Sequence, residues 1–333
     1  MKRAKWWKSL ENSTVKCHLC PHNCTISEGE QGICQVRENQ DGVLYSLTYN
    51  HPVTINVDPI EKKPLYHFLP GTKSLSIGTA GCNFSCDFCQ NWRLVNSEPE
   101  RYKEVKPEKV IQICKDKNCE SIAFTYNEPT IYAEYALKIS KLAKEENIKT
   151  LMVTNGFISE KAIDDLYPYI DAANIDLKAF TEEFYTEHCN GRMEPVLTAI
   201  EYIYDLDTFL EITNLVIPGL NDDKNEFKEL LQWIIDKIGS GTPLHLSAFR
   251  PAYQLKNIPS TSKSTLDSFY ELSKELGMEN VYEGNVMSDE HNDTYCPACE
   301  ELLIGRSQFT VTEKNLDQDK CKYCGEKINV RVD

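Results

Sequence analysis

The alternation of apolar and polar positions predicts a repeated strand–loop–helix pattern from residue 73 onward. Short apolar runs typical of buried strands occur at residues 74–77, 121–124, 150–153, 173–175, 209–217 and 244–246. Segments with helical character lie between and after them, at residues 129–146, 182–189, 195–204, 222–238 and 261–276. Strands that alternate with helices indicate parallel strands with crossover helices. The chain is therefore predicted to have an α/β fold, with fewer units than a complete eight-unit barrel.

Polar or glycine-rich groups follow each of these predicted strands. In (β/α) barrels the active site is built at the carboxyl ends of the strands, so these groups are expected to meet on one rim. For Asp176 and Lys178 an ordinary strand-end ion pair is the alternative, and for His245 it is a core histidine. The candidate rim residues are Glu128, Asn155, Asp176, Lys178, Ile217, Asn221, His245 and Ser247.

Three cysteines follow the first predicted strand, with the spacing C-x3-C-x2-C, at Cys82, Cys86 and Cys89. Three thiolates from one short loop can hold three irons of a cubane iron–sulfur cluster, whereas a fully protein-ligated cluster of this type needs four cysteines. One iron would be open to a ligand from outside the chain. The alternative, a zinc site, fits poorly because zinc knuckles usually consist of two C-x2-C pairs.

A second group of cysteines lies in the N-terminal section, residues 1–72. Four thiols within residues 17–34 indicate a metal site, either structural zinc or a second iron–sulfur centre, rather than free cysteines. Beyond this group, residues 43–49 and 53–57 predict a hairpin, because they are rich in β-branched and aromatic residues on both sides of a turn. The four cysteines are Cys17, Cys20, Cys24 and Cys34.

The C-terminal section, residues 286–333, carries two C-x2-C knuckles with 21 residues between them. This arrangement is typical of a zinc ribbon or a rubredoxin-like iron site, and structural zinc is favoured over iron or no metal. The four ligands would be Cys296, Cys299, Cys321 and Cys324. The cysteines outside every group, expected to be small buried residues or idle thiols, are Cys114, Cys119 and Cys189.

Composition limits the classes of protein that remain. A length of 333 residues with 41% hydrophobic residues fits one large globular domain with small additions. No apolar run is long enough to span a membrane and the N-terminus lacks a signal peptide, so a cytoplasmic protein is expected. In that compartment the 14 cysteines would serve as metal ligands and free thiols. A net charge of −15 disfavours a broad nucleic-acid-binding surface without excluding a local basic patch.

The cysteine loop resembles that of radical S-adenosylmethionine (SAM) enzymes. The wider chain resembles AmmeMemoRadiSam-system radical SAM proteins, relatives of pyruvate formate-lyase activating enzymes. The resemblance implies a partial (β/α)6 barrel over residues 73–285, flanked by small metal-binding lobes at residues 1–72 and 286–333. The segments that carry it are CHLCPHNC, VDPIEKKPLYHFLPG, TAGCNFSCDFCQNW, TYNEPTI, TNG, ANIDLKAF, VIPGLND and NTYCPACEELLI.

The resemblance also implies roles for individual residues. SAM would chelate the open iron of a 4Fe-4S cluster, and an electron delivered through the cluster would split SAM into methionine and a 5′-deoxyadenosyl radical. Phe88 would pack near the adenine and Glu128 would hold the SAM amino group. The other implied contacts are Asn155, Asp176 and Lys178 at the ribose, the carboxylate or the substrate channel, residues 217–221 at the adenine, and His245 and Ser247 near the nucleoside.

The expected function is therefore hydrogen abstraction by a radical derived from SAM. The implied partners are Memo-like and AMMECR-like proteins and a flavodoxin-type or ferredoxin-type electron donor. The substrate stays open between a glycyl residue of a partner protein, an RNA and a small molecule. A non-catalytic iron–sulfur electron carrier or a metal-dependent scaffold is the alternative, and release of 5′-deoxyadenosine would distinguish the enzyme from both.

Overall fold

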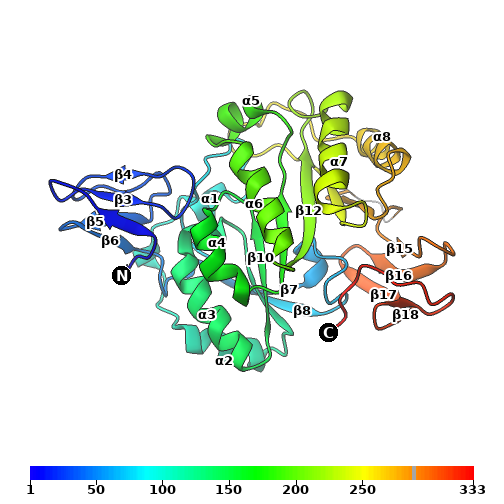
Figure 1. The fold of residues 1–333 in the computed structure, drawn as a ribbon, viewed down its shortest axis with the longest axis horizontal. Coiled ribbons are helices and arrows are strands. Elements are labelled where there is room, and N and C mark those ends of the chain that lie inside the picture. The colour runs from blue at the N-terminus through cyan, green and yellow to red at the C-terminus, as the bar shows by residue number, and fades with distance from the viewer. Residues whose placement is uncertain (287–289) are drawn as a thin grey trace.

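The central feature of the computed structural model, which describes residues 1–286 and 290–333, is a curved eight-stranded sheet (Figure 1). Its strands follow the order β14-β13-β12-β11-β10-β9-β8-β7, and every neighbouring pair is parallel except β7 and β8. The strands are β7 (Thr54–Pro59), β8 (Lys73–Gly78), β9 (Ser121–Phe124), β10 (Lys149–Thr154), β11 (Ala172–Asp176), β12 (Phe209–Val216), β13 (Leu244–Ala248) and β14 (Val281–Gly284).

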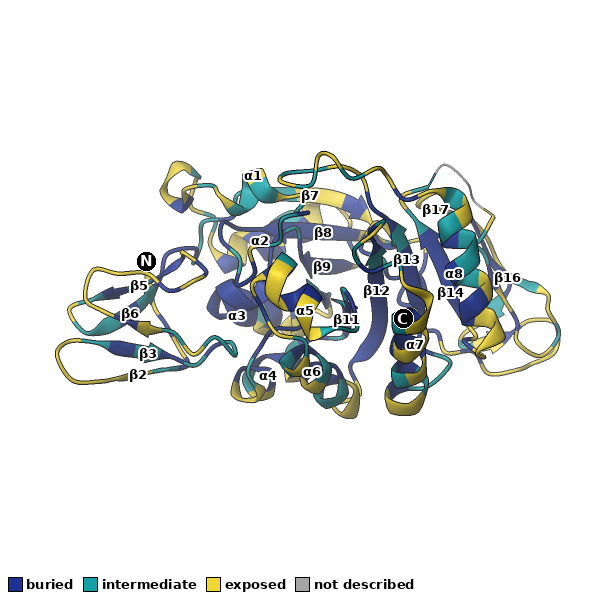
Figure 2. Cartoon of the chain, turned by 90° about the horizontal axis from the view of Figure 1, so that it is seen from above, coloured by how far each residue is buried: buried dark blue, intermediate teal, exposed yellow. Residues whose placement is uncertain are grey.

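The strands curve around the interior of a partial barrel, and helices cover the outer face of the sheet (Figure 2). The longer ones are α2 (Pro107–Asp116), α3 (Ala133–Glu145), α4 (Glu160–Leu166), α6 (Glu194–Asp205), α7 (Lys224–Ile238) and α8 (Lys263–Glu275). Shorter turns are α1 (Trp92–Val95), α5 (Glu182–Phe184), the 3-10 segments η1 (Ile60–Lys62), η2 (Pro99–Arg101), η3 (Pro129–Tyr132) and η4 (Tyr167–Tyr169), and the π-helix η5 (Tyr185–Cys189).

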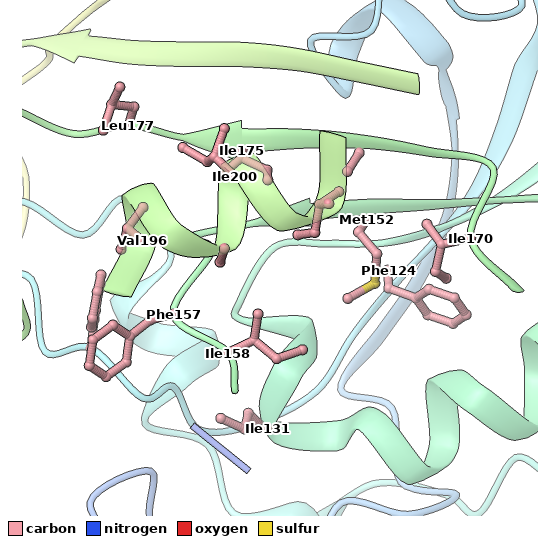
Figure 3. Close-up of a cluster of buried hydrophobic side chains, with 14 of the residues drawn as sticks. Phe124, Ile131, Met152, Phe157, Ile158, Ile170, Ile175, Leu177, Val196 and Ile200 are labelled. Atoms are coloured by element: carbon pink, nitrogen blue, oxygen red, sulfur yellow. The ribbon is translucent and has the colours of Figure 1, made fainter. Parts of the chain in front are cut away.

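The core lies between the sheet and these helices, because each helix buries one apolar stripe. Ile175 of β11 and Met152 of β10 lie beside Val196 and Ile200 of α6 in this layer (Figure 3). Local signals set the helix ends: the Asp223 carboxylate accepts hydrogen bonds from the first backbone N–H groups of α7, and Ser262 does the same for α8.

All six predicted strands are present and lie in the parallel part of the sheet, which also contains β14, a strand that the sequence pattern did not predict. The predicted hairpin between residues 43–49 and 53–57 is wrong. Strand β6 (Val43–Ser46) pairs with β5 (Arg37–Gln40), whereas β7 leaves the lobe and pairs antiparallel with β8. The physical reason is that β7 satisfies its backbone N–H and C=O groups by pairing over six residues with β8, while residues 50–52 connect the two sheets.

Two small β-rich lobes lie at opposite ends of the barrel (Figure 1). The N-terminal lobe contains β1 (Lys2–Arg3), β2 (Trp7–Ser9), β3 (Val15–Cys17), β4 (Thr25–Ile26), β5 and β6. The C-terminal lobe contains β15 (Thr294–Tyr295), β16 (Leu302–Ser307), β17 (Thr310–Lys314), β18 (Leu316–Asp317) and β19 (Lys320–Cys321). Among the described helices, none has the length and apolar character that crossing a membrane requires.

Candidate active site

A cavity of about 810 Å³ opens at the carboxyl ends of the parallel strands. Its volume lies within the range of about 300 to 1,000 Å³ common to ligand pockets. The predicted site residues that line it are Cys82, Cys86, Phe88, Cys89, Glu128, Asn155, Asp176, Lys178, His245 and Ser247. Ile217 and Asn221 do not line this cavity. The fold therefore brings the predicted rim residues together around one cavity, except for those in the segment after β12.

The cysteine loop is fixed by side chains from the two neighbouring strand ends. Asn127, after β9, donates hydrogen bonds to the carbonyl oxygens of Ala80 and Gly81, over 3.2 and 2.8 Å. Asn83 donates to the carbonyl oxygen of Phe157 over 2.7 Å and accepts from the Asn155 side chain over 2.9 Å. These contacts hold the loop backbone from both sides, so the three cysteines have defined positions.

The π-helix η5 supports the same loop from the opposite side. The Ser85 and Asp87 N–H groups donate to the carbonyl oxygens of Cys189 and His188, over 3.0 and 3.1 Å. A hydrogen bond from the Cys189 thiol lowers the pKa of Cys86, against the opposing effect of burial. Cys189 was expected to be a small buried residue or an idle thiol; it is buried, and its spacing gives no sign of this contact. Single π-turns often occur at functional sites.

The three loop cysteines fit a cluster with one open iron. All three are free thiols, and all three line the cavity. In the described part of the chain, their sulfurs are not a set lying mutually within 4.8 Å. At least one pair of these sulfurs therefore lies further apart than the separation of about 3.8 Å that a single tetrahedral ion requires, whereas in a cubane each thiolate binds a different iron.

Glu128 is a buried carboxylate on the cavity wall, with only 2% of its surface exposed. One oxygen, Oε1, accepts hydrogen bonds from Thr130 N, Thr130 Oγ1 and Thr154 Oγ1 at 2.9, 2.6 and 2.7 Å. The other, Oε2, accepts from Asn155 N at 2.7 Å. Burial raises the pKa of Glu128, and these hydrogen bonds oppose the rise. The carboxylate is thus held rigidly at a wall where it can face a cation.

Asp176 and Lys178 form an ion pair at the end of β11, with Nζ and Oδ2 2.9 Å apart. The ammonium group also lies 5.8 Å from the centre of the Phe88 ring. Burial lowers the pKa of Lys178, but the negative charges of Asp176 and Cys86 outweigh it and hold that pKa well above its ordinary value. The pair is therefore an ion pair as the alternative reading held, and it also faces the cavity beside the cysteine loop.

His245 is a core histidine with a buried hydrogen-bond partner, and it also lies on the wall of the cavity. Its Nε2 lies 2.7 Å from Oε2 of Glu211, a fully buried carboxylate that also accepts from the backbone N–H groups of Tyr66 and His67. The ring nevertheless lines the cavity. Two residues further along the same strand, β13, Ser247 Oγ accepts a hydrogen bond from Asn285 over 2.8 Å.

Asn221 is a brace beneath the rim. Its Oδ1 accepts from Ile217 N over 2.6 Å, and its Nδ2 donates to the carbonyl oxygens of Lys178 and Leu215 over 2.6 and 2.8 Å. Ile217 itself is fully buried. In this structure the segment after β12 fixes the position of the Lys178 backbone.

Comparison with known proteins agrees with this geometry. Residues 76–234 match the Radical SAM superfamily. Uncharacterized protein MJ0808 of Methanocaldococcus jannaschii is 40% identical over 334 residues, which cover 99% of each chain. The chain belongs to the radical SAM superfamily. Membership implies a 4Fe-4S cluster and SAM.

Activating enzymes are among the relatives of this radical SAM protein. Pyruvate formate-lyase 1-activating enzyme of Escherichia coli is 23% identical over 162 residues, which cover 47% of this chain and 66% of the relative. Among solved structures, Streptococcus suis SuiB bound to precursor peptide SuiA has a TM-score of 0.53 and 16% identity. That match covers 68% of this chain and 52% of SuiB, and it shows a shared fold.

Sequence reasoning missed one whole wall of the radical SAM cavity. The segment between β7 and β8 contributes Lys63, whose Nζ lies 2.7 Å from Oδ2 of Asp58. Tyr126, after β9, donates to the same carboxylate oxygen over 2.6 Å. The signal was present in the segment VDPIEKKPLY, where charged residues interrupt an otherwise apolar stretch. The missed lining residues include Glu61, Lys62, Lys63, Pro64, Tyr66, Tyr126, Arg250, Glu283, Asn285 and Phe309.

The C-terminal cysteines form a compact set of four. Their sulfurs all lie within 4.8 Å of one another, with Cys296 and Cys324 3.6 Å apart and Cys299 and Cys321 3.7 Å apart. Four thiolates about 2.3 Å from a tetrahedral ion are separated by about 3.8 Å. The set therefore fits a single metal ion, and zinc and iron are both compatible with it.

Proposed function

We propose that this radical SAM protein is an enzyme that cleaves SAM reductively and abstracts a hydrogen atom from a substrate bound in the same cavity. The observation that carries the proposal is the placement of three free thiols, and no fourth from their loop, on the wall of a cavity of about 810 Å³. When bound, the cluster and SAM supply one-electron chemistry that yields a 5′-deoxyadenosyl radical.

The chain's own residues would bind the cluster and orient SAM. Cys82, Cys86 and Cys89 would hold the 4Fe-4S cluster, since their sulfurs line one wall. Glu128 would attract the SAM ammonium group, because its carboxylate is fixed by four hydrogen bonds and lies beside the cysteine loop. Lys178 would face the SAM carboxylate.

The remaining predicted residues would define the nucleoside side of the site. Phe88 would pack against the adenine, Asn155 would bond the ribose, and His245 and Ser247 would contact the nucleoside from β13. Asp176 would hold Lys178 in place through their ion pair. Residues 217–221 would act through the backbone that Asn221 braces.

We propose further that the hydrogen atom comes from a polypeptide segment. The support is that a relative of this chain is named as an activating enzyme of pyruvate formate-lyase, which is itself a protein. Two of the residues that line the cavity, Lys62 and Arg250, are exposed, so the cavity reaches the surface, where a chain segment can enter. An RNA or a small molecule as the hydrogen donor would be a different outcome of the substrate search.

The proposed setting is the AmmeMemoRadiSam system in the cytoplasm. Segments such as CHLCPHNC and TAGCNFSCDFCQNW support it through the resemblance. The partners would be Memo-like and AMMECR-like proteins and a flavodoxin-type or ferredoxin-type electron donor. This protein itself would be an oxidoreductase, with a structural zinc bound by the C-terminal cysteines. The 14 free thiols suit a reducing compartment. Co-purification with tagged Memo-like protein tests the partnership, and no enrichment over an unrelated bait would contradict it.

The deciding experiment is anaerobic reconstitution with iron and sulfide, followed by dithionite and SAM. Wild-type protein should release 5′-deoxyadenosine, read by liquid chromatography and mass spectrometry. Cys86→Ala should abolish the release, whereas Cys114→Ala, a buried cysteine outside every group, should leave it intact. Intact SAM beside a reducible wild-type cluster would support the carrier or scaffold alternative instead.

A further inference from the structure

The four N-terminal cysteines converge although they come from separate turns. Cys17 ends β3, Cys20 and Cys24 lie in the loop before β4, and Cys34 lies in the loop before β5. All four line one small cavity inside the N-terminal lobe. None of them forms a disulfide, so the four sulfurs are available as ligands.

Their spacing differs from that of the C-terminal cysteines. A single tetrahedral zinc would need sulfur–sulfur separations of about 3.8 Å, as the C-terminal four show at 3.6 and 3.7 Å. Within the described residues, the cysteine set whose sulfurs lie mutually within 4.8 Å is the C-terminal one; no three of the N-terminal sulfurs do so. In this respect the N-terminal set resembles Cys82, Cys86 and Cys89, whose three sulfurs also do not all lie within 4.8 Å of one another.

A buried donor without a partner points to the same cavity. Arg37 lines it and has only 1% of its surface exposed. Its Nη2 atom bonds to both carboxylate oxygens of Glu134, at 2.5 and 2.6 Å. Its Nε has no hydrogen-bond partner among the described residues. A buried N–H normally finds an acceptor, and the sulfurs of an iron–sulfur cluster accept such bonds, which tune its potential.

The N-terminal cysteine loop lies directly against the catalytic one. His22, between Cys20 and Cys24, has its Nε2 atom 2.7 Å from the carbonyl oxygen of Asn83, the neighbour of Cys82. On the other side, a Cβ atom built at Gly81 would lie 2.6 Å from the carbonyl oxygen of Cys34. The two cysteine loops therefore meet at His22 and Asn83, and their backbones approach each other closely at Gly81 and Cys34.

We propose that Cys17, Cys20, Cys24 and Cys34 hold an iron–sulfur cluster that relays electrons to the catalytic cysteine site. The relay rests on the proposed function, whereas the cluster itself does not. An external low-potential donor of the flavodoxin or ferredoxin class would lose one electron to the N-terminal cluster. That cluster would then be reoxidised as the catalytic cluster gains the electron, and no bond is made or broken in either transfer.

The lobe offers a point of entry for such a donor. Cys20 and Cys24 are only partly buried, so the cluster edge would lie near the surface. Ile33, beside Cys34, is 47% exposed and also lines the small cavity. An exposed apolar side chain at the edge of a redox site suits the small, transient interface of electron-transfer partners.

Metal and sulfide analysis tests the cluster without any activity. Cys82, Cys86 and Cys89 are replaced together by Ala, and the variant is reconstituted anaerobically. It should keep acid-labile sulfide, about four irons for a cubane or about two for a smaller cluster, and an EPR signal on reduction. Cys17→Ala combined with Cys24→Ala in that background should remove all three, whereas Cys114→Ala should not. Zinc without sulfide in the triple variant would overturn the proposal.

The relay is tested by the choice of reductant. In Cys24→Ser, reduction of the catalytic cluster by reduced flavodoxin, followed by freeze-quench EPR, should be at least tenfold slower than in wild type. Reduction by titanium(III) citrate, a small molecule with direct access to the cavity, should be unchanged and confirms that the variant is folded. The relay would be overturned if both reductants were slowed equally, or if neither were slowed. Absence of 5′-deoxyadenosine from wild type with either reductant would contradict the proposed function while leaving the metal analysis standing.

Discussion

The Nδ2 atom of Asn127 donates a hydrogen bond to the carbonyl oxygen of Gly81 over 2.8 Å. This bond joins the end of β9 to Gly81, the residue immediately before Cys82. The same side chain accepts from Thr79 N over 3.0 Å, so it spans the whole entry to the cysteine loop. The next residue, Glu128, is thereby held beside the cysteine loop on the wall of the same cavity.

Asn127→Ala should loosen the cysteine loop, because it leaves the buried carbonyl oxygen of Gly81 without its donor and the backbone N–H of Thr79 without its acceptor. Each unsatisfied group costs about 1–3 kcal/mol. Iron retention after reconstitution should fall several-fold, with a similar fall in 5′-deoxyadenosine release. Asn56→Ala, an exposed asparagine on β7, is the control. Full iron retention in Asn127→Ala would show that the loop is held by other contacts.

Glu128→Gln should weaken SAM binding about tenfold or more, because the neutral amide no longer attracts an ammonium group. In addition, the amide NH2 group would face N–H and O–H donors where a carboxylate oxygen now accepts their hydrogen bonds. Isothermal titration with the reconstituted protein measures the dissociation constant. Glu160→Gln, on the exposed start of α4, changes the net charge equally and should have no effect. An unchanged constant in Glu128→Gln would argue against its assigned role.

Gly81→Ala should separate the N-terminal lobe from the cysteine loop. Gly81 has a φ of +81°, and its new Cβ atom would meet the Cys34 carbonyl oxygen at 2.6 Å. Gly219→Ala provides the control, since Gly219 has a φ of +75° but no atom within 4 Å of that position. The control should lose only the backbone cost, about 1–2 kcal/mol, and Gly81→Ala should lose clearly more. Equal free energies of unfolding would show that the lobe moves freely.

His67 should make stability depend on pH below neutrality. Burial lowers its pKa from 6.5 to about 4, and its ring nitrogens lie 2.6 Å from the Asn329 carbonyl oxygen and 2.5 Å from the Tyr282 hydroxyl. Between pH 6.5 and about 4, His67 is protonated in the unfolded chain but stays neutral in the folded chain. The free energy of unfolding should therefore fall as pH drops from 6.5 to about 4.

The size of the His67 effect is about 3 kcal/mol at most. His67→Gln should be less stable at pH 7 but should lose less stability on acidification than wild type, as measured by urea unfolding across this range. His51→Gln, on the turn before β7, serves as the control and should follow the wild-type curve. Parallel curves for wild type and His67→Gln would contradict the assignment.

Cys299→Ala should remove the C-terminal metal and lower the melting temperature, because a bound structural ion contributes its binding free energy to folding. Metal analysis should show the loss of about one zinc per chain, with the iron content unchanged. Cys119→Ala, a buried cysteine outside the groups, is the control. Loss of one iron in place of zinc would identify a rubredoxin-like site, and an unchanged melting temperature would contradict a structural metal.

The sequence by itself determined six of the seven strands in the parallel part of the sheet, and the three cysteine groups. Both are local properties: apolar periodicity is read within a strand, and ligand spacing within a loop. It also placed Glu128, Asp176 and Lys178 on one rim, because parallel strands present their carboxyl ends at the same edge.

Only the tertiary structure decided what meets across the chain. The pairing of β7 with β8, the wall that contains Lys63 and the contact between Cys86 and Cys189 all join residues from different elements. The same holds for His22 and Asn83, which are 61 positions apart in the chain. Such contacts depend on how whole elements pack, and packing is set by the burial of many side chains together rather than by the spacing of any two. That is why the sequence predicted the cysteine groups, while the adjacency of two of them emerged only from the fold.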